Sequence, residues 1–391
     1  MKRILIACLW ALPLGVMAQN PITEILKQVE ANNLMLQSVG YSVQAQKSTL
    51  ASENNLSDPE VEYVHQWGNP TEAGKETELT VIQEFDFPTA YVQRNRYNQI
   101  QGKVLDRDVE EALQDIKLKA AQLCVQIIGL NRESALLQQL ANNLEKHAQR
   151  MEQALSDGDA VVLEVNKVKM SLMEINAELR DNDGLHQEVL QQLIALNGGK
   201  PVQFTASTYP ELPTIVQDVN ALTDDYREHD ARLHRLSDEV AAGSQLIKVK
   251  QAEGLPKMHV GYQRNTALGE KMNGVVGGIS IPLFSNRGKV KSARAEQTSR
   301  ALELQDQQLQ LQSEVLALYN KKEQLAKVLK GFDQDLIQNQ VTLLGKALDL
   351  GEMTIMDYLT EVNQVLDVQK EFAGSEQEYQ QICYELIRYR L

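Results

Sequence analysis

The same series of elements occurs twice along the chain, and this duplication limits the possible folds more than any other feature. Each copy consists of a helical segment, two short strands, a long helix, an acidic turn and a returning helix. The paired positions are Pro59 with Pro256, Pro88 with Pro282, and Gly158 with Gly351, at offsets of 197, 194 and 193 residues. Because this offset changes so little, we interpret the pattern as an internal duplication with small changes in the loops.

The duplication predicts two structural repeats joined by a short linker. Each repeat would contain a β-hairpin followed by a long helical hairpin. The expected ranges are 19–200 for the first repeat with its hairpins at 59–87 and 89–196, 201–213 for the linker, and 214–391 for the second repeat with its hairpins at 255–282 and 286–390.

Four long helices dominate the two repeats, because apolar residues recur at steps of three and four and breakers are rare. We expect these helices from Thr89 to Ser156, Val161 to Leu196, Gly288 to Leu350 and Thr354 to Tyr389. At about 1.5 Å per residue, the first would be about 100 Å long. Helices of this length need partner helices to cover their apolar stripes, so coiled-coil packing is expected.

Two pairs of short strands precede the long helices. Apolar and polar residues alternate in Pro59–Gly68, Glu76–Phe87, Leu255–Gln263 and Val275–Ile281, and residues 68–74 and Asn265–Gly274 read as polar connecting loops. Each strand has about ten residues, which is long enough to cross a bilayer when tilted. Short hairpins on a soluble protein would show the same pattern, so the alternation alone does not decide between the two.

Four strands cannot close a barrel, for which about eight is the practical minimum. The strands of one chain therefore either lie on a soluble core or join the strands of other copies. The chain after its N-terminal segment has no apolar run of about 18 residues, so a membrane crossing would require a closed barrel. Together with the long helices, these constraints favour a homo-oligomer.

The N-terminus has the pattern of a secretory signal peptide at residues 1–18. A basic start is followed by an apolar run from Ile4 to Val16 and by small residues, and cleavage is expected after Ala18. A retained membrane anchor is the alternative. The mature chain then keeps Cys124 and Cys383 in an oxidising compartment, where they are either two buried thiols or a disulfide.

Charge and motif content exclude several function classes. The formal net charge of −14 argues against nucleic acid as a partner. The six histidines are scattered, with no metal-ligand spacing, and no nucleophile motif is present. We therefore expect no enzymatic activity, no metal and no cofactor.

Two stretches resemble the TolC-type outer-membrane factors, and the resemblance covers essentially the whole mature chain. The first is Ile281–Gly288, where a strand turns into a long helix. The second is Gly351–Leu359, in which Asp357 takes the acidic position of the family's motif. The residues Asn286–Gly288 slightly favour a resemblance to the metal-cation efflux branch of this family.

The resemblance implies a mainly α-helical chain with a small transmembrane β part. Duplicated coiled-coil hairpins and four strands per chain would form, in a homotrimer, a 12-stranded barrel continuous with a 12-helix tunnel. The implied location is the outer membrane of a Gram-negative cell, with a long periplasmic extension. The implied partners are outer-membrane lipid, a periplasmic adaptor (membrane fusion) protein and an inner-membrane pump such as an RND-type transporter.

In such an assembly the chain would be a channel subunit of a tripartite efflux or type I secretion system, serving as a passive exit duct. One alternative is a soluble periplasmic coiled-coil adaptor or interaction protein, which would carry a single helical hairpin, whereas this hairpin is doubled. Another is a binding or sensor protein, for which no stretch remains to build a ligand domain. The sequence does not indicate whether the substrate is a metal ion, a drug or a polypeptide.

In the implied fold, the two helical turns form the periplasmic aperture. The acidic residues around these turns are Asp157, Asp159, Glu164, Asp349, Glu352 and Asp357. We expect an acidic ring that attracts cations, with Asp357 as the strongest candidate. Acids are also favoured at helix N-termini, so Asp159, Glu164 and Glu352 are open to interpretation as caps and first-turn residues.

Two further groups of residues follow from the resemblance. The expected adaptor-docking residues at the turns are Gly158, Val161, Leu163, Gly351, Thr354 and Met356. The expected membrane-interface aromatics are Tyr63, Trp67, Phe85, Phe87, Tyr262 and Phe284. The alternatives are ordinary coiled-coil core for the first group and hydrophobic cover over the helix ends for the second.

Overall fold

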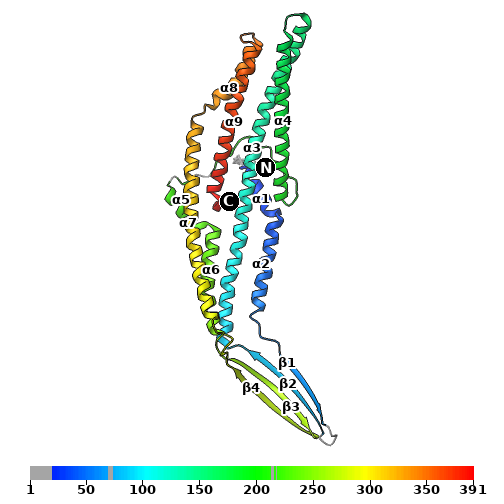
Figure 1. The fold of residues 1–391 in the computed structure, drawn as a ribbon, viewed down its shortest axis with the longest axis vertical. Coiled ribbons are helices and arrows are strands. Elements are labelled where there is room, and N and C mark those ends of the chain that lie inside the picture. Colours follow the sequence, from blue (N-terminus) through cyan, green and yellow to red (C-terminus); the bar gives the residue numbers. More distant parts are fainter. Residues whose placement is uncertain (1–19, 69–73, 213–214, 217) are drawn as a thin grey trace, which may run out of the picture. The chain divides into compact units, whose positions relative to one another are not determined.

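The computed structural model describes residues 20–68, 74–212, 215–216 and 218–391, so the predicted signal peptide lies outside the described residues. The helices are α1 (Pro21–Asn32), α2 (Leu34–Ser52), α3 (Pro88–Asp157), α4 (Val162–Leu196), α5 (Val219–His229), α6 (Ala231–Ala252), α7 (Lys289–Lys330), α8 (Gln334–Asp349), α9 (Ile355–Leu386) and the 3₁₀ helix η2 (Arg388–Arg390). The strands are β1 (Glu60–Trp67), β2 (Lys75–Phe85), β3 (Lys257–Ala267) and β4 (Glu270–Ser280). Figure 1 shows these elements along the chain.

The described chain forms two compact units, and each contains segments of both predicted repeats. Unit 1 combines the segment up to Asn33 with residues 116–215 and 321–385. Unit 2 combines residues 34–115, 216–320 and 386–391. None of the described helices holds a stretch apolar enough to cross a bilayer.

Unit 2 contains one antiparallel sheet in the order β1-β2-β3-β4 (Figure 1). The hairpin β1–β2 comes from the first repeat and β3–β4 from the second, and β2 pairs with β3 from Glu76 opposite Ala267 to Phe85 opposite Met258. The four predicted strands are therefore confirmed. Pairing between β2 and β3 joins two hairpins, each marginally stable alone, into one four-stranded sheet, and a sheet needs about three strands or more for independent stability.

The two faces of this sheet differ in polarity, although neither is uniform. Because side chains alternate along a strand, the register places one set of residues on one face. We call this the apolar face; its apolar residues include Val61, Tyr63, Leu79, Val81, Val260, Tyr262, Val275 and Ile279, and it also carries polar residues such as Gln83, Arg264 and Asn273. The opposite, polar face carries Glu62, Glu76, Glu78, Gln263 and Asn265. On the polar face, Asn265 Nδ2 donates to Glu76 Oε1 at 2.6 Å and Gln263 donates to Glu78.

One predicted loop was wrong. The stretch Asn265–Gly274 was expected to be a polar loop, but β3 and β4 continue through it until Ala267 pairs with Glu270. The turn consists of Leu268 and Gly269 alone, with φ values of 54° and 90°. A positive φ at both central residues is the geometry of a tight two-residue hairpin turn. The polar composition that suggested a loop belongs instead to the ends of two long strands.

Ion pairs and aromatic contacts fix the helices and the C-terminus of unit 2. Arg94 Nη2 lies 2.6 Å from Asp86 Oδ2 and its Nε lies 3.3 Å from Glu253 Oε1. The Tyr389 ring in η2 packs 4.5 Å from the Tyr226 ring of α5, between ring centroids. These contacts join residues of both repeats around the bases of the strands and the end of the chain.

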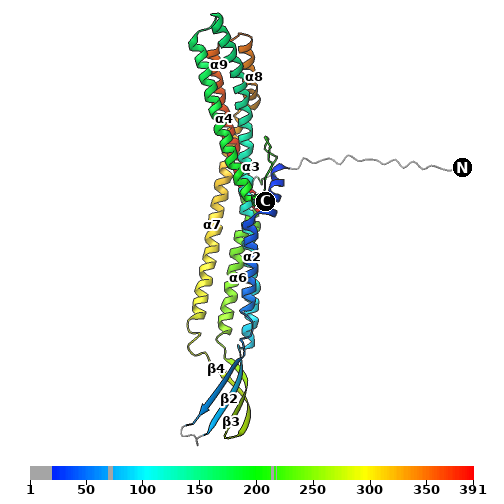
Figure 2. The same cartoon turned by 90° about the vertical axis from the view of Figure 1, so that its right-hand side faces the viewer.

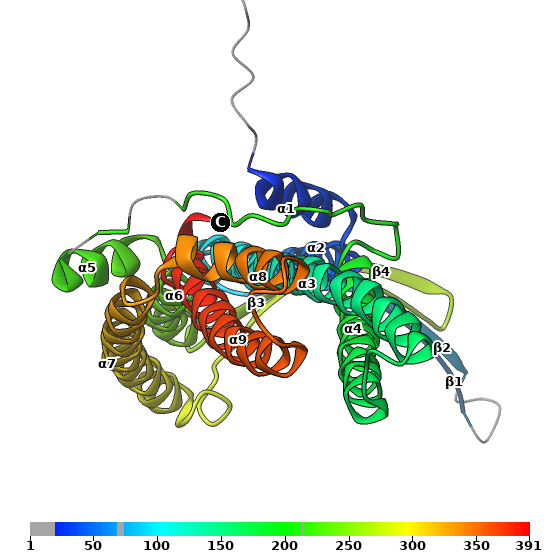
Figure 3. The ribbon, with the colours of Figure 1, turned by 90° about the horizontal axis from the view of Figure 1, so that it is seen from above.

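The buried core of unit 1 is formed by residues of α3, α4, α8 and α9. Figure 3 shows these helices from above. The buried members of this core include Leu137, Leu140, Leu144, Val168, Ile175, Val341, Leu344, Tyr358 and Val362. The buried leucines of α3 recur at the three- and four-residue steps that predicted this helix. The predicted helices Thr89–Ser156 and Val161–Leu196 are confirmed, each within one residue at either end.

The predicted helix from Gly288 to Leu350 was wrong in one respect, because it is broken between α7 and α8. Asp333 caps α8, and its side chain accepts a hydrogen bond of 2.9 Å from the Leu336 amide. The break turns Phe332 against Phe372 of α9, with ring centroids 5.5 Å apart. Gly331 and Asp333 are the residue types that end and start helices.

Cys124 and Cys383, the two cysteines within the described residues, are free thiols. Cys124 and Cys383 are both buried in unit 1. Burial raises the pKa of Cys124 to about 12 and that of Cys383 to about 11, which keeps both protonated at neutral pH. Of the two interpretations left open by the sequence, the structure has the buried thiols.

The cap of α8 gives a test of this fold. We expect Asp333→Ala to lower the free energy of unfolding by about 1 kcal/mol, because the first turn of α8 loses its side-chain acceptor. Asp335→Ala is the matched control, since Asp335 lies in the same turn and is not the cap. Urea unfolding followed by circular dichroism measures both. Equal losses in the two variants would contradict the assigned cap.

Candidate functional site

The turn between α3 and α4 is a glycine-terminated helix end. Gly158 adopts φ +86°, and its amide donates to the Leu155 carbonyl at 3.2 Å. The Asp159 amide donates to the Ala154 carbonyl at 2.8 Å. This pair of bonds is the Schellman motif, which satisfies the last carbonyls of a helix and favours glycine at its left-handed position.

The turn between α8 and α9 repeats the same geometry. Gly351 adopts φ +72°, its amide donates to Leu348 at 3.1 Å, and the Glu352 amide donates to Ala347 at 2.9 Å. Both turns lie at the same end of unit 1 (Figure 2). The duplicated sequence therefore produces two equivalent backbone turns side by side, which we call the tip.

The helices that leave the two turns start differently. Before α9, Thr354 Oγ1 accepts from the Asp357 amide at 3.2 Å and donates to the Asp357 carboxylate at 2.7 Å. Before α4, Val161 occupies the cap position with no side-chain hydrogen bond. Val161, Val162 and Leu163 are 61%, 56% and 76% exposed. The N-terminus of α9 is thus capped by the hydrogen bonds between Thr354 and Asp357, whereas the N-terminus of α4 presents an exposed apolar patch.

The six predicted acidic residues all lie at the tip. Asp157, Asp159, Glu352 and Asp357 are exposed, and Glu164 is half-buried in the first turn of α4. The sequence offered a capping interpretation for Asp159, Glu164 and Glu352, yet the capping contact with a side chain belongs to Asp357. Asp357 therefore combines a structural contact with its predicted role in the aperture.

Asp349 differs from the other acids because basic residues of α3 surround it. Its carboxylate lies 3.2 Å from Lys146 Nζ, accepts a short hydrogen bond from Arg150, and lies 3.8 Å from His147 Nε2. The hydrogen bonds from Arg150 and Lys146 lower the pKa of Asp349. The sequence analysis did not predict this cluster: the sequence places Lys146, His147 and Arg150 within about one helical turn, but it does not show which acid they contact.

His147 is the buried member of this cluster. It is 7% exposed, and its ring centroid lies 5.9 Å from that of the fully buried Tyr358. Burial lowers the pKa of His147, against the opposing effect of Asp349. The imidazole is therefore neutral at neutral pH and sits beside a carboxylate that is already paired with two other cations.

The predicted docking residues fall into two groups. Gly158, Val161 and Leu163 are exposed together on the first turn. In the second turn, Thr354 is engaged with Asp357, and Met356 packs against the apolar core of unit 1. Gly351 and Thr354 are exposed like their counterparts Gly158 and Val161, so the two sets differ in exposure only at Met356, which is half-buried where Leu163 is exposed.

The predicted aromatic residues lie on or beside the apolar face of the sheet in unit 2. The register places Tyr63, Phe85 and Tyr262 on that face with Trp67, which is 73% exposed near the β1–β2 connection. Phe87 and Phe284 follow the ends of β2 and β4, and Phe284 is 82% exposed. Trp67 therefore lies at one end of the strands, Phe85, Phe87 and Phe284 lie at the other end, and Tyr63 and Tyr262 lie near the middle.

No metal site accompanies these features: the described residues contain no group of three or more histidine, cysteine, aspartate or glutamate side chains arranged to hold an ion.

The fold is that of solved bacterial outer-membrane channels. The chain is similar to the outer-membrane channel OprN, with 14% identity and a TM-score of 0.73 over 94% of this chain and 89% of that one. It is similar to the CmeC channel of Campylobacter jejuni (13% identity, TM-score 0.73, 94% and 85% covered) and to VceC of Vibrio cholerae (14%, 0.72, 94% and 95%). No family model and no curated protein matches the sequence.

At these identities, the likeness establishes the fold. The predicted fold class is confirmed for the single chain, which is mainly helical with four antiparallel strands. The resemblance to the TolC-type outer-membrane factors is supported at the same level, since the similar structures are outer-membrane channels.

The buried histidine predicts a pH dependence of stability. Because folding lowers the pKa of His147, the unfolded chain binds its proton more readily, and stability is lost as the pH falls below about 6.5. His147→Gln should weaken the decrease in the free energy of unfolding between about pH 7.5 and about pH 5.5. His186→Gln on α4 is the control. An unchanged decrease in His147→Gln would refute this assignment.

Proposed function

We propose that the chain is a subunit of an outer-membrane exit duct, and the observation that carries this proposal is the polarity of the sheet. Its apolar face is open: Val61, Val275 and Ile279 are 64%, 83% and 65% exposed. Burying apolar surface contributes about 25 cal/mol per Å², so a wholly hydrated face of this kind is unfavourable. If lipid covered the apolar face and water covered the polar face, the side chains of both faces would have a favourable environment.

The edges of the sheet require further copies of the chain. Within the described residues, β1 and β4 each pair on one side only. Unpaired backbone groups in lipid cost several kcal/mol each, so these edges must be joined. Pairing β4 of one copy with β1 of the next closes a ring, and three copies supply 12 strands, above the minimum of about eight for a barrel.

The helices connected to these edge strands carry apolar residues that also lack cover. In α7, which follows β4, Leu302, Leu309 and Leu316 repeat every seven residues and are 61%, 60% and 45% exposed. In α2, which precedes β1, Leu34 and Tyr41 are 65% and 73% exposed. Seven-residue spacing is that of a coiled-coil seam. The same neighbouring copy would cover the sheet edge and the helix seam.

The activity we propose is passive conduction rather than catalysis. Three copies would form a homotrimeric water-filled duct that spans the outer membrane and extends into the periplasm, and no cofactor is involved. An inner-membrane pump, acting through a periplasmic adaptor protein, would supply substrate and energy. The apolar patch of Val161, Val162 and Leu163 is our candidate for the adaptor contact. A soluble adaptor would leave the apolar face of the sheet in water, which makes that alternative less favourable.

The acids at the tip would set the ion preference of the duct. Asp157, Asp159, Glu352 and Asp357 are exposed without a basic partner among the ion pairs of the described residues. Asp349, by contrast, is paired with Lys146 and Arg150. We therefore assign the cation preference to the first four residues and give Asp349 a role in holding α8 against α3.

The first experiment is to fractionate cells and determine the size of the protein in detergent. We expect a heat-sensitive trimer in the outer-membrane fraction. Leu309→Glu should abolish the trimer, because it places a charge in the proposed seam. Gln308→Glu, at the exposed neighbouring position, should leave it intact. A monomer in the soluble periplasmic fraction would end the duct proposal.

A bilayer conductance measurement tests the acidic aperture. Asp357→Asn removes the negative charge but keeps a side-chain oxygen that can accept the hydrogen bond from the Thr354 hydroxyl. A unit charge about 4 Å from an ion is worth about 1 kcal/mol in water, which corresponds to about a fivefold change in cation-to-anion permeability. Asp367→Asn, further along α9, is the control. Unchanged selectivity in Asp357→Asn would count against the acidic aperture.

A further inference from the structure

The charged residues of the four strands are divided between the two faces of the sheet. The register places the glutamates of the strands on the polar face: Glu60, Glu62, Glu76, Glu78, Glu84 and Glu270. Along the described strands the apolar face carries no acidic residue, but it carries Lys75, Arg264 and Lys271. We call these three residues the sheet cations.

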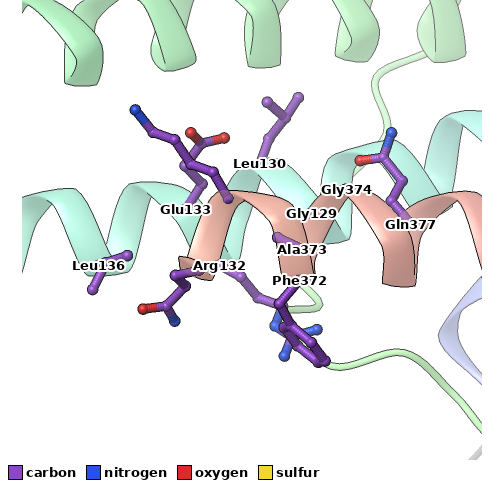
Figure 4. Close-up of a pocket in the computed structure, with 11 residues that line it drawn as sticks. Gly129, Leu130, Arg132, Glu133, Leu136, Phe372, Ala373, Gly374 and Gln377 are labelled. Carbon is purple, nitrogen blue, oxygen red and sulfur yellow. The ribbon is translucent and has the colours of Figure 1, made fainter. Parts of the chain in front are cut away.

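The sheet cations lack the acidic partners that cations have in other parts of the molecule. In unit 1, for example, Arg132 and Lys370 line a pocket between α3 and α9 (Figure 4), and they form ion pairs with Glu376 and Glu178. The sheet cations are exposed, and none of them has an ion pair within the described residues. An anion from outside the chain can therefore bind them without breaking an existing pair.

The sheet cations lie near the hairpin turns, at the end of the strands far from the helices (Figure 1). Lys75 is the first residue of β2 and pairs with Trp67, the last residue of β1. Arg264 and Lys271 lie within a few residues of the turn between β3 and β4. Closer to the helices, the same face carries Val81, Val260, Val275 and Ile279. The face is therefore mainly apolar near the helices and cationic near the turns.

The aromatic residues near the turns suit the surface of a membrane, where tryptophan and tyrosine are enriched. The Trp67 ring lies 5.8 Å from the His65 ring, between ring centroids. The Tyr262 hydroxyl donates to Asn273 Oδ1 at 2.7 Å, and Asn273 lies nearer the turn than Val275, with which Tyr262 pairs. A lysine or arginine facing lipid is costly at the middle of a bilayer and far less costly near its surfaces. The cationic end of the face therefore fits the boundary between lipid and water.

The positions of the sheet cations suit more than one phosphate group. Arg264 and Lys271 are diagonal neighbours on adjacent strands, a relation that separates two residues by about 7–8 Å, so both long side chains can reach one phosphate. Lys75 lies on β2, two strands away from Lys271. Between them lie Thr77 and Thr266, which pair with each other and offer hydroxyl donors.

We propose that the sheet cations bind a phosphorylated lipid, with one phosphate between Arg264 and Lys271 and a second at Lys75. This inference rests on the proposed function, because it requires the apolar face to lie in lipid. In the proposed duct the helices extend into the periplasm, so the turns and the sheet cations meet the outer leaflet. Each lysine or arginine near an anionic membrane surface raises affinity about fivefold, so three raise it about 100-fold.

Native mass spectrometry tests this site on the trimer, purified from the outer-membrane fraction and freed of lipid in detergent. The trimer is titrated with lipid A that carries two phosphates, with lipid A that carries one, and with phosphatidylcholine, whose headgroup has no net charge. We expect the first to bind at least about tenfold more tightly than phosphatidylcholine, and the second to lie between them. Equal affinities for the three lipids would overturn the proposal.

Two triple variants locate the binding. Lys75→Gln/Arg264→Gln/Lys271→Gln should lower the affinity for bisphosphorylated lipid A about 100-fold, and the same spectrum reports whether the trimer is kept. Lys103→Gln/Lys248→Gln/Lys291→Gln is the control, because it removes the same charge from exposed positions on α3, α6 and α7 and should leave the affinity unchanged. Equal losses in both variants would overturn the assignment, since net charge alone would then explain binding.

The outcomes separate this inference from the duct proposal. A trimer from the outer membrane that binds bisphosphorylated lipid A no better than phosphatidylcholine would overturn the lipid site and leave the duct standing. A soluble monomer would overturn both, because the apolar face would then have no lipid to meet.

Discussion

The pairing of β2 with β3 is the interaction on which the rest of this structure depends. It joins one hairpin from each repeat into a single sheet along the register from Glu76–Ala267 to Phe85–Met258. This register fixes which side chains share a face, and a slip of one residue would send every apolar side chain to the polar side. The pairing also makes β1 and β4 the edge strands of the sheet. The helices connected to these edge strands are therefore α2, which precedes β1, and α7, which follows β4.

Much of this architecture could be predicted from the sequence, because periodicity acts over many residues. The extent of α3 follows from a long run of apolar steps without proline, and the strands follow from alternation at Tyr63 and Leu79. The free-thiol state could not be predicted, since both bonding states suit helical cysteines. The Leu268–Gly269 turn was also missed, because two residues with positive φ leave little trace in a polar stretch.

The position of the candidate site could be predicted from the sequence, but the ion pairs and hydrogen bonds of its acidic residues could not. The duplicated glycines located both turns, and the acids around them were identified by proximity in the sequence. Which acid is neutralised depends on α3 lying beside α8, a contact between residues about 200 apart that no local pattern encodes. Asp349 and Asp357 therefore look alike in the sequence, although one is surrounded by cations and the other is bound to a threonine hydroxyl.

The different starts of α4 and α9 have a consequence for stoichiometry. The two turns have the same backbone conformation. A trimer of this chain would therefore present six similar hairpin ends, related by approximate sixfold symmetry. Val161 and Thr354 reduce that symmetry, because one class of end is apolar and the other is occupied by its own hydrogen bonds. A partner protein that recognises the backbone conformation of the turn alone would find six equivalent binding sites at the tip of the trimer. One that requires the apolar patch would find three, spaced by ends that it does not bind.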